Sequence, residues 1–326
     1  MKHSEMIWLP PVLYRILQQN TDRENRLSMP QLLAMLEEEG FQADRRSVYK
    51  AIHVLKENGV EVIFDKTGGK QGYRLVHLFT PAESMYLISA VRDSFSLTPG
   101  KADLFAAKIR SLMSRQEELL LPEIRQDVIH TDNEQVLEIS QKLLEAIRDC
   151  VFVDFRYYDM TLSRQKKYRR NSERYHLIPY AVVSSGGRFY CVFYSPVHQN
   201  FANYRIDKMD NVTRTSLKAD PVPFSLADHM RSSFQMYHGD ARTVTAEFDL
   251  SLSSQVFDSF GTDLIISKVT DRTFTASFRT AITPPLISWL LQYPSSVRVI
   301  RPQELIDRLM ETADTIHNTY QKEGKK

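Results

Sequence analysis

The chain has 326 residues, of which 25% are charged and 42% hydrophobic, and its formal net charge is +2. This length predicts two or three domains, each with its own core, and the composition is that of an ordinary globular protein. No apolar run is long enough to cross a bilayer and the start has no signal-peptide pattern, so we expect a cytoplasmic protein. The two cysteines, Cys150 and Cys191, lie far apart in the sequence and predict neither a disulfide framework nor a zinc site.

The first 79 residues predict three short helices followed by a hairpin. Apolar positions at helical spacing predict a helix around residues 12–17, with a polar loop at 18–26. Ser28 opens a second helix that Gly40 ends, and Asp44 opens a third that ends at Asn58-Gly59. Two strands, at 60–64 and 72–78, flank a turn. This order predicts a winged helix-turn-helix DNA-binding domain over residues 1–79.

The third helix of this head carries the candidate DNA-binding residues. Its basic and polar side chains lie away from its apolar stripe, as in a helix that contacts base edges in the major groove. Residues 40–76 contain seven Lys or Arg against four Asp or Glu. A solvated helix face is the alternative interpretation, but the hairpin that follows favours DNA. The candidates are Arg45, Arg46, Ser47, Tyr49, Lys50 and His53 on the helix, with Lys70 in the hairpin turn as a phosphate contact.

Residues 80–135 predict a helical linker. Thr80 and Glu83 form a capping-box pattern around Pro81 and open a first helix. A second helix is expected at 101–120, and a third opens at 131–134 and continues to about 147. The wide apolar faces of these helices suit either a core or the surface that a dimeric DNA-binding protein needs to pair two heads.

The middle of the chain is rich in strand patterns. A strand at 151–158 is followed by a run at 164–174 with six bases and one acid. Two further strands flank a Ser-Ser-Gly-Gly break at 184–187, which is typical of a hairpin, and a third lies near 204–209. The basic run suits either phosphate or single-stranded nucleic acid, or a solvated hairpin tip. The candidate basic patch consists of Lys166, Lys167, Arg169 and Arg170.

The residue order of this region resembles the WYL domain, a ligand-sensing module of bacterial transcriptional regulators. The resemblance rests on a Leu-x-Pro-Tyr segment at 177–180, the Gly-Gly turn, Phe189-Tyr190-Cys191 in the place of Trp-Tyr-Leu, and Tyr-Arg-Ile-Asp-Lys-Met at 204–209. Ala202 stands where the family often carries an arginine.

The resemblance implies an SH3/Sm-like β-barrel over residues 136–220 and a basic pocket for an anionic ligand, such as a nucleotide or single-stranded nucleic acid. The candidate ligand-binding residues are Arg156, His176, Tyr190 and Arg205. Barrel packing is the alternative role for Tyr190, an ion pair with Asp207 for Arg205, and a structural hydrogen bond for His176.

Pro221 and Pro223 mark the start of a further unit at 221–326. Its pattern predicts strands at 244–250, 264–269, 273–279 and 297–300 and helices at 253–260, 284–292 and 302–320, the order of a ferredoxin-like α+β unit. Its place after the sheet region, with the Ile-Ser-Trp-Leu-Leu segment at 287–291, resembles the C-terminal extension of WYL domains.

The sequence contains no nucleophile elbow, phosphate-binding loop or dinucleotide-binding glycine pattern, so we expect neither a cofactor nor an enzyme. The prediction is an α+β multidomain, ligand-responsive transcriptional regulator. We expect it to be a homodimer that binds double-stranded operator DNA and an anionic ligand, and no membrane. Two alternatives remain open. One is a nucleotide- or nucleic-acid-processing enzyme that uses the winged head for docking; the other is a nucleic-acid-binding module without operator specificity.

Overall fold

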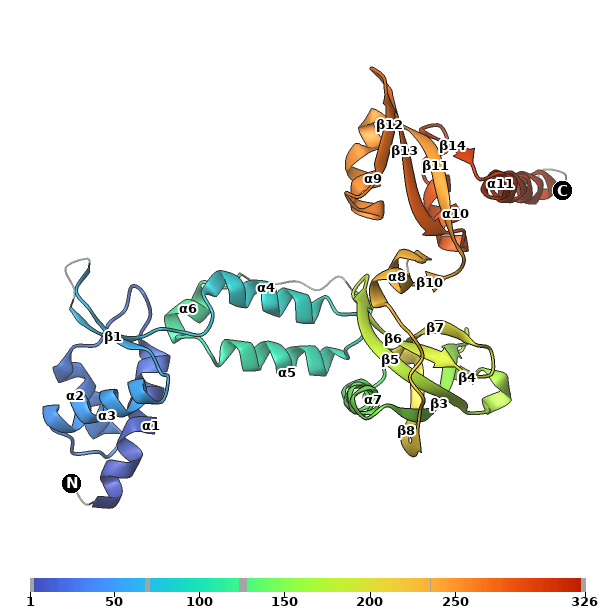
Figure 1. Ribbon diagram of the computed structural model, residues 1–326. Coiled ribbons are helices and arrows are strands. Elements are labelled where there is room, and N and C mark those ends of the chain that lie inside the picture. The colour runs from blue at the N-terminus through green and yellow to red at the C-terminus, as the bar shows by residue number, and fades with distance from the viewer. Residues whose placement is uncertain (1–2, 68–70, 123–127, 235, 324–326) are drawn as a thin grey trace. The chain divides into compact units, whose positions relative to one another are not determined.

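The computed structural model describes residues 3–67, 71–122, 128–234 and 236–323 (Figure 1). The chain divides into two compact units, Met1–Glu134 and Gln135–Lys326, which we call unit 1 and unit 2. The fold is mixed, with helices and β-sheets in both units. Within the described residues, no helix combines the length and apolarity of a membrane span.

Unit 1 begins with the three predicted helices. They are α1 (His3–Asn20), α2 (Met29–Glu38) and α3 (Arg45–Glu57). The starts of α2 and α3 are confirmed: Ser28 precedes α2, and the Asp44 side chain accepts a hydrogen bond from the Ser47 backbone at 2.7 Å. Helix α1 is longer than predicted and runs through two prolines, because Leu9 before them is buried in the same core as Leu13.

The hairpin of unit 1 is confirmed as β1 (Val62–Asp65) and β2 (Gly72–Leu75), an antiparallel pair with shorter strands than expected. A further bridge joins Leu27 to Tyr73, whose backbone groups exchange hydrogen bonds of 3.0 and 2.8 Å. One core holds α1 to α3 and the hairpin together. Lys70 lies outside the described residues.

The helical linker differs from prediction in two places. The structure has α4 (Pro81–Arg92), α5 (Pro99–Arg110) and α6 (Arg115–Leu119), so the single helix expected at 101–120 is wrong. Ser114 caps a new helix there, since its hydroxyl accepts from the Glu117 backbone at 3.0 Å. The third helix does not open at 131–134 but at Val136, as the first element of unit 2.

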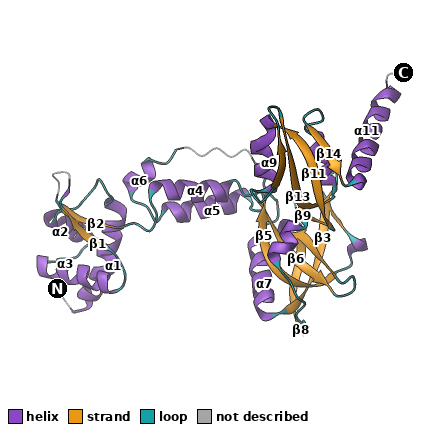
Figure 2. Ribbon diagram, turned by 45° about the horizontal axis from the view of Figure 1, so that its top comes forward, coloured by secondary structure: helices purple, strands orange, loops and turns teal. Residues whose placement is uncertain are grey.

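Unit 2 starts with α7 and a six-stranded sheet that curls into a half-barrel (Figures 1 and 2). The strand order is β4-β3-β5-β6-β7, with β8 paired to β3, and the described residues show no pairing between β7 and β8 that would close a barrel. Gly186 and Gly187, both with positive φ, form the predicted β5–β6 turn. The elements are α7 (Val136–Asp149), β3 (Val151–Met160), β4 (Lys166–Tyr168), β5 (Tyr175–Ser185), β6 (Arg188–Ser195), β7 (Asn200–Arg205) and β8 (Met209–Lys218).

Aromatic side chains fill the inside of the half-barrel. Phe155 on β3 contacts Tyr175 on β5, Phe193 on β6 and Tyr204 on β7, with ring centroids 5.0 to 5.5 Å apart. Helix α7 packs against β3, β5 and β8. These contacts hold the strands that carry the candidate ligand-binding residues.

A short segment that the sequence did not predict follows the half-barrel. It consists of α8 (Leu226–Arg231), β9 (Ser233–Phe234) and β10 (Tyr237–His238). Asn203 of β7 anchors it, because its side chain lies 2.8 Å from His229 Nε2 and donates to the Met236 carbonyl at 2.8 Å. This segment becomes one wall of the groove described below.

The rest of unit 2 has the predicted order of strands and helices. The second sheet is antiparallel throughout, with strand order β12-β13-β11-β14. Its core includes Phe248, Val256 and Leu286 from the sheet, α9 and α10. The elements are β11 (Ala241–Asp249), α9 (Ser253–Phe260), β12 (Ile265–Val269), β13 (Thr273–Ala281), α10 (Pro284–Leu291), β14 (Val297–Arg301) and α11 (Gln303–Glu323).

Candidate DNA-binding surface and ligand groove

Helix α3 turns one face into the core of unit 1 and the opposite face to solvent. Its buried residues follow the predicted spacing and are Val48, Ala51, Ile52 and Leu55. Arg45, Arg46 and Lys50 are exposed in its first two turns. Their side chains make no ion pair within the described residues. The pKa of the Asp44 carboxyl is lowered mainly by hydrogen bonds from Ser47 and to a smaller extent by the nearby charge of Arg46. The start of α3 therefore presents three cationic groups to solvent.

Two other candidates on α3 have contacts within the protein. The Tyr49 ring lies edge-on to that of Tyr73, with centroids 6.5 Å apart, and remains 53% exposed. Burial and the neighbouring Tyr49 hydroxyl raise the pKa of Tyr73 to about 12. His53 Nε2 lies 3.3 Å from Glu57 Oε1 one turn later. Tyr49 thus connects α3 to the hairpin, and His53 forms an exposed side-chain pair with Glu57 along the same helix.

One basic side chain of the hairpin, Arg74, forms an ion pair within the protein. Asp65 accepts from Arg26 at 3.1 Å and from Arg74 at 3.0 Å. Hydrogen bonds from Thr67, and then from these arginines, hold the pKa of the Asp65 carboxyl well below its usual range. Arg74 is therefore committed to the hairpin, whereas the Lys66 amino group lies over the Phe64 ring at 5.8 Å.

Unit 2 contains a groove of about 1050 Å³ on one side of the half-barrel. Its walls come from β6, β7, the α8–β10 segment and the end of α9. Four cationic side chains and one carboxylate line it, together with several aromatic rings. The lining consists of Tyr157, Arg169, Ser185, Gly186, Arg188, Tyr190, Asn200, Phe201, Ala202, Asn203, Arg205, Lys208, Ser233, Phe234, Met236, Tyr237, Asp258 and Ser259.

Two of the four predicted ligand-binding residues meet in this groove. Tyr190 and Arg205 are directly paired across β6 and β7. The Arg205 guanidinium donates two hydrogen bonds to the buried Asp207, of 3.0 and 2.6 Å, so part of its donor capacity is used inside the protein. Burial raises the pKa of Tyr190, which keeps its hydroxyl protonated and able to donate.

Three further cations of the groove come from outside that predicted set. Arg169, which belonged to the predicted basic patch, donates to Asp159 at 2.7 Å and lies over the Tyr157 ring at 5.0 Å. Lys208 shares the same carboxylate at 3.2 Å. Arg188 and Lys208 were not predicted as ligand contacts. The sequence contains a signal for each: Arg188 lies two positions before Tyr190 on β6 and so shares its face, and Lys208 lies in the Tyr-Arg-Ile-Asp-Lys-Met segment.

The other two predicted ligand-binding residues do not line the groove. The His176 ring stacks on Phe152, with centroids 4.4 Å apart, and its Nδ1 lies 2.6 Å from Asp154 Oδ1. The Arg156 guanidinium lies over the Tyr168 ring at 5.7 Å. Strand alternation explains the separation, since positions 152, 154 and 156 of β3 lie on the face opposite to Phe155.

The predicted basic patch is also divided. Lys166 contacts Asp210 at 3.2 Å and lies over the Tyr158 ring, while the Arg170 guanidinium lies 4.4 Å from the Tyr175 ring centroid. Lys167 is exposed on β4. Of the four patch residues, Arg169 alone is among the groove-lining residues.

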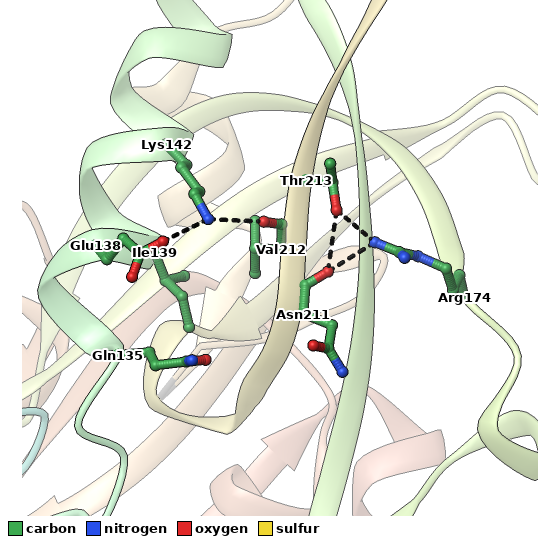
Figure 3. A pocket seen from close by; sticks show the side chains of 8 residues that line it. All are labelled: Gln135, Glu138, Ile139, Lys142, Arg174, Asn211, Val212 and Thr213. Carbon is green, nitrogen blue, oxygen red and sulfur yellow. Dashed lines mark hydrogen bonds and ion pairs between the residues drawn. The ribbon is translucent and has the colours of Figure 1, made fainter.

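A smaller polar cavity of about 280 Å³ lies between α7 and β8 (Figure 3). Its two cations are already used by the protein. Lys142 contacts Glu138 at 2.6 Å and the Val212 carbonyl at 3.2 Å, and Arg174 donates to the Asn211 carbonyl at 2.7 Å. These contacts attach α7 and the start of β5 to β8, which is a structural role.

The chemistry that the groove offers is recognition of an anion. Arginines and lysine bind phosphate or carboxylate oxygens, and exposed aromatic rings such as Tyr237 stack on planar groups. Within the described residues, no three His, Cys, Asp or Glu side chains form a group able to hold a metal ion.

Comparison with known proteins assigns two parts of unit 2. Residues 138–214 match the WYL domain, and residues 240–316 match the WCX domain. A relative named as an uncharacterized HTH-type transcriptional regulator, YobV of Bacillus subtilis (strain 168), is 21% identical over 317 residues, which cover 90% of this chain and 96% of the relative. Proteasome accessory factor B/C (PafBC) of Arthrobacter aurescens is a similar solved structure, with 15% identity and a TM-score of 0.28. The match covers 92% of this chain and spans 47% of PafBC.

Proposed function

We propose that this chain, which contains a WYL domain and a WCX domain, is a transcriptional regulator that binds operator DNA through unit 1 and an anionic ligand through the groove of unit 2. The observation that carries the DNA part is the exposed, unpaired trio Arg45, Arg46 and Lys50 at the start of α3. The similarity to an HTH-type regulator over most of both chains supports the same assignment.

Two fold assignments belong to this proposal. We assign the winged helix-turn-helix fold to the head, supported by α1 to α3 followed by the β1–β2 hairpin and the added Leu27–Tyr73 bridge. We assign the ferredoxin-like fold to the C-terminal part, supported by the antiparallel order β12-β13-β11-β14 and by the two helices that join these strands. In the winged fold, the third helix is the one that enters the major groove.

The ligand we propose is a nucleotide or a short single-stranded nucleic acid. Its phosphates would contact Arg188, Arg205 and Lys208, and its bases would stack on Tyr237. Asp159 and Asp207 neutralise part of the cationic charge, which favours a ligand with few phosphates over a long polyanion.

The proposed regulator is a homodimer that pairs through the helical linker. Helices α4 and α5 leave large apolar side chains exposed, including Tyr86 at 72% and Leu104 at 53%. Two copies of such a surface form a self-complementary interface. Sedimentation should show a dimer, and Leu104→Glu should convert it to a monomer without unfolding unit 2.

Selection of bound sequences from a pool of random duplexes tests the DNA part. A palindromic motif with two half-sites is the expected result, because a symmetric dimer places two heads on one duplex. A pool that stays random after several rounds refutes operator binding and leaves nonspecific nucleic-acid binding as the function.

Mass spectrometry of the copurifying small molecules tests the ligand part. A bound nucleotide or oligonucleotide that Arg188→Ala loses, and that His176→Ala retains, supports the groove. A nucleotide consumed on incubation with the protein would instead indicate an enzyme.

A further inference from the structure

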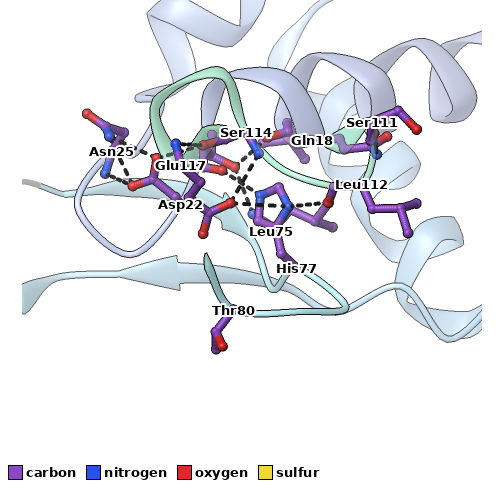
Figure 4. Close-up of polar contacts among 12 residues, drawn as sticks. Gln18, Asp22, Asn25, Leu75, His77, Thr80, Ser111, Leu112, Ser114 and Glu117 are labelled. Atoms are coloured by element: carbon purple, nitrogen blue, oxygen red, sulfur yellow. Dashed lines mark hydrogen bonds and ion pairs between the residues drawn. The ribbon is translucent and has the colours of Figure 1, made fainter. Parts of the chain in front are cut away.

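His77 lies in unit 1 where the loop after α1, the residues after β2 and the α5–α6 turn meet (Figure 4). Its side chain is 5% exposed. The ring Nε2 lies 2.6 Å from the Thr21 carbonyl oxygen, and Nδ1 lies 3.1 Å from the Leu112 carbonyl oxygen. Both ring nitrogens therefore face backbone oxygens, one from the DNA-binding head and one from the linker.

These two contacts bear on which ring nitrogens donate a hydrogen bond. A carbonyl oxygen only accepts hydrogen bonds, and a neutral imidazole has one N–H. A neutral ring would therefore leave one nitrogen lone pair facing a carbonyl lone pair in a buried position, which is unfavourable. An imidazolium donates from both nitrogens and satisfies both oxygens.

The charges around the ring favour the cation. Glu117 Oε2 on α6 lies 3.7 Å from Nδ1 and also accepts from the Ser114 backbone. His77 and Glu117 line a second groove, in unit 1, with a volume of about 480 Å³. The other charged residues that line it are Asp22, Arg23, Glu24 and Arg74. Among the described residues, Glu117 is the carboxylate within 4 Å of a His77 ring nitrogen.

We propose that His77 is an imidazolium that joins the head to the α5–α6 turn and thereby positions the head for DNA. The effect on DNA rests on the proposed function, whereas the protonation state does not. Thr21 directly follows α1, and α1 packs against α3. A displacement of the α5–α6 turn is therefore passed through Thr21 and α1 to the helix that carries Arg46.

Neighbouring contacts across the same junction provide a matched control. Gln18 Nε2 donates to the Ser111 carbonyl at 2.8 Å, but this contact is exposed. An exposed hydrogen bond contributes less to stability than a buried hydrogen bond that involves a charged group. A buried bond of that kind is worth about tenfold or more in an equilibrium constant. Gln18→Ala should therefore have little effect where His77→Phe has a large one.

The decisive test is ¹⁵N NMR of the histidine ring nitrogens in the full chain, with the His77 signals assigned by their loss in His77→Gln. We expect both nitrogens to carry a proton at neutral pH. A spectrum in which one His77 nitrogen is unprotonated overturns the inference. This measurement uses the native chain, so it stands even if a His77 variant fails to fold.

Hydrogen exchange tests the positioning role. In His77→Phe, which keeps a ring without N–H donors, the amides near Leu112 and Thr21 should exchange about tenfold faster or more, while those in α2 are unchanged. Equal exchange in His77→Phe and Gln18→Ala overturns the role. Duplex binding should weaken in His77→Phe but not in Gln18→Ala. If the native chain binds no duplex, the proposed function fails, while the NMR result still decides the state of His77.

Discussion

Replacing Gly72 by alanine is expected to destabilise the head more than any exposed substitution in the hairpin. A Cβ at this position would lie 2.7 Å from the Leu27 carbonyl oxygen and 2.8 Å from its carbonyl carbon. Both neighbours are backbone atoms held by the Leu27–Tyr73 bridge, so they cannot move without breaking its two hydrogen bonds. Overpacking costs about 1–3 kcal/mol, and each lost hydrogen bond costs about 1 kcal/mol. We therefore expect a loss of about 3 kcal/mol.

Thermal unfolding followed by circular dichroism measures this loss. A destabilisation of about 3 kcal/mol lowers the melting temperature of a unit of this size by roughly 10 °C. Hydrogen exchange locates it, because the amides of Leu27 and Tyr73 should exchange first. Gly100→Ala is the matched control: a Cβ there meets nothing within 4 Å, and alanine favours the α5 helix in which Gly100 lies. If Gly72→Ala melts with the native chain, the argument from close backbone contact is refuted.

Four further variants test the remaining arguments. Arg46→Ala should lose about 1–3 kcal/mol of discrimination between operator and random duplex, measured by competition binding; Lys70→Ala should weaken both duplexes alike and reduce the salt dependence. Arg188→Ala should weaken binding of a nucleotide or oligonucleotide about tenfold in calorimetry, and equal affinity would exclude this residue from the groove contacts. Burial raises the pKa of Asp22, but hydrogen bonds from Asn25, Glu24 and Ser114 outweigh it and leave the pKa below 3.8. Its contribution is therefore present above that pH and lost as the pH falls through the lowered pKa, so acid unfolding of unit 1 should depend less on pH in Asp22→Asn.

Local patterns were sufficient to predict most elements. The helix starts at Ser28, Asp44 and Thr80 follow from capping chemistry that depends on residues three positions apart. The break between α5 and α6 was missed although Ser114 and Glu117 form the same pattern, because the apolar periodicity on both sides suggested one continuous helix. The α8–β10 segment was missed because its strands are two residues long and depend on Asn203, which is distant in the sequence.

The groove of unit 2 was predicted only in part, and the reason is the geometry of the curled sheet. Alternation along one strand shows which residues share a face, but not which faces of different strands meet. Tyr190 and Arg205 were placed together correctly because they belong to neighbouring strands. His176 and Arg156 have suitable chemistry, yet they lie with Phe152 and Asp154 away from the groove.

The composition of the groove limits how a ligand can act. A ligand shifts a protein between two arrangements only if it binds one of them better, and a complete switch needs a difference of about 10⁴-fold. Residues fixed on β6 and β7, such as Tyr190 and Arg205, offer the same contacts in any arrangement. Six groove residues come from outside the half-barrel, and their distances from Arg188 vary if these elements move: Ser233, Phe234, Met236, Tyr237, Asp258 and Ser259. Among them, Tyr237 offers an exposed ring and Asp258 a carboxylate. We therefore expect differential binding to depend on Tyr237 and Asp258, so Tyr237→Ala should reduce the ligand's effect on DNA affinity more than it reduces ligand affinity. Equal reductions would show that the groove binds its ligand without distinguishing the two arrangements.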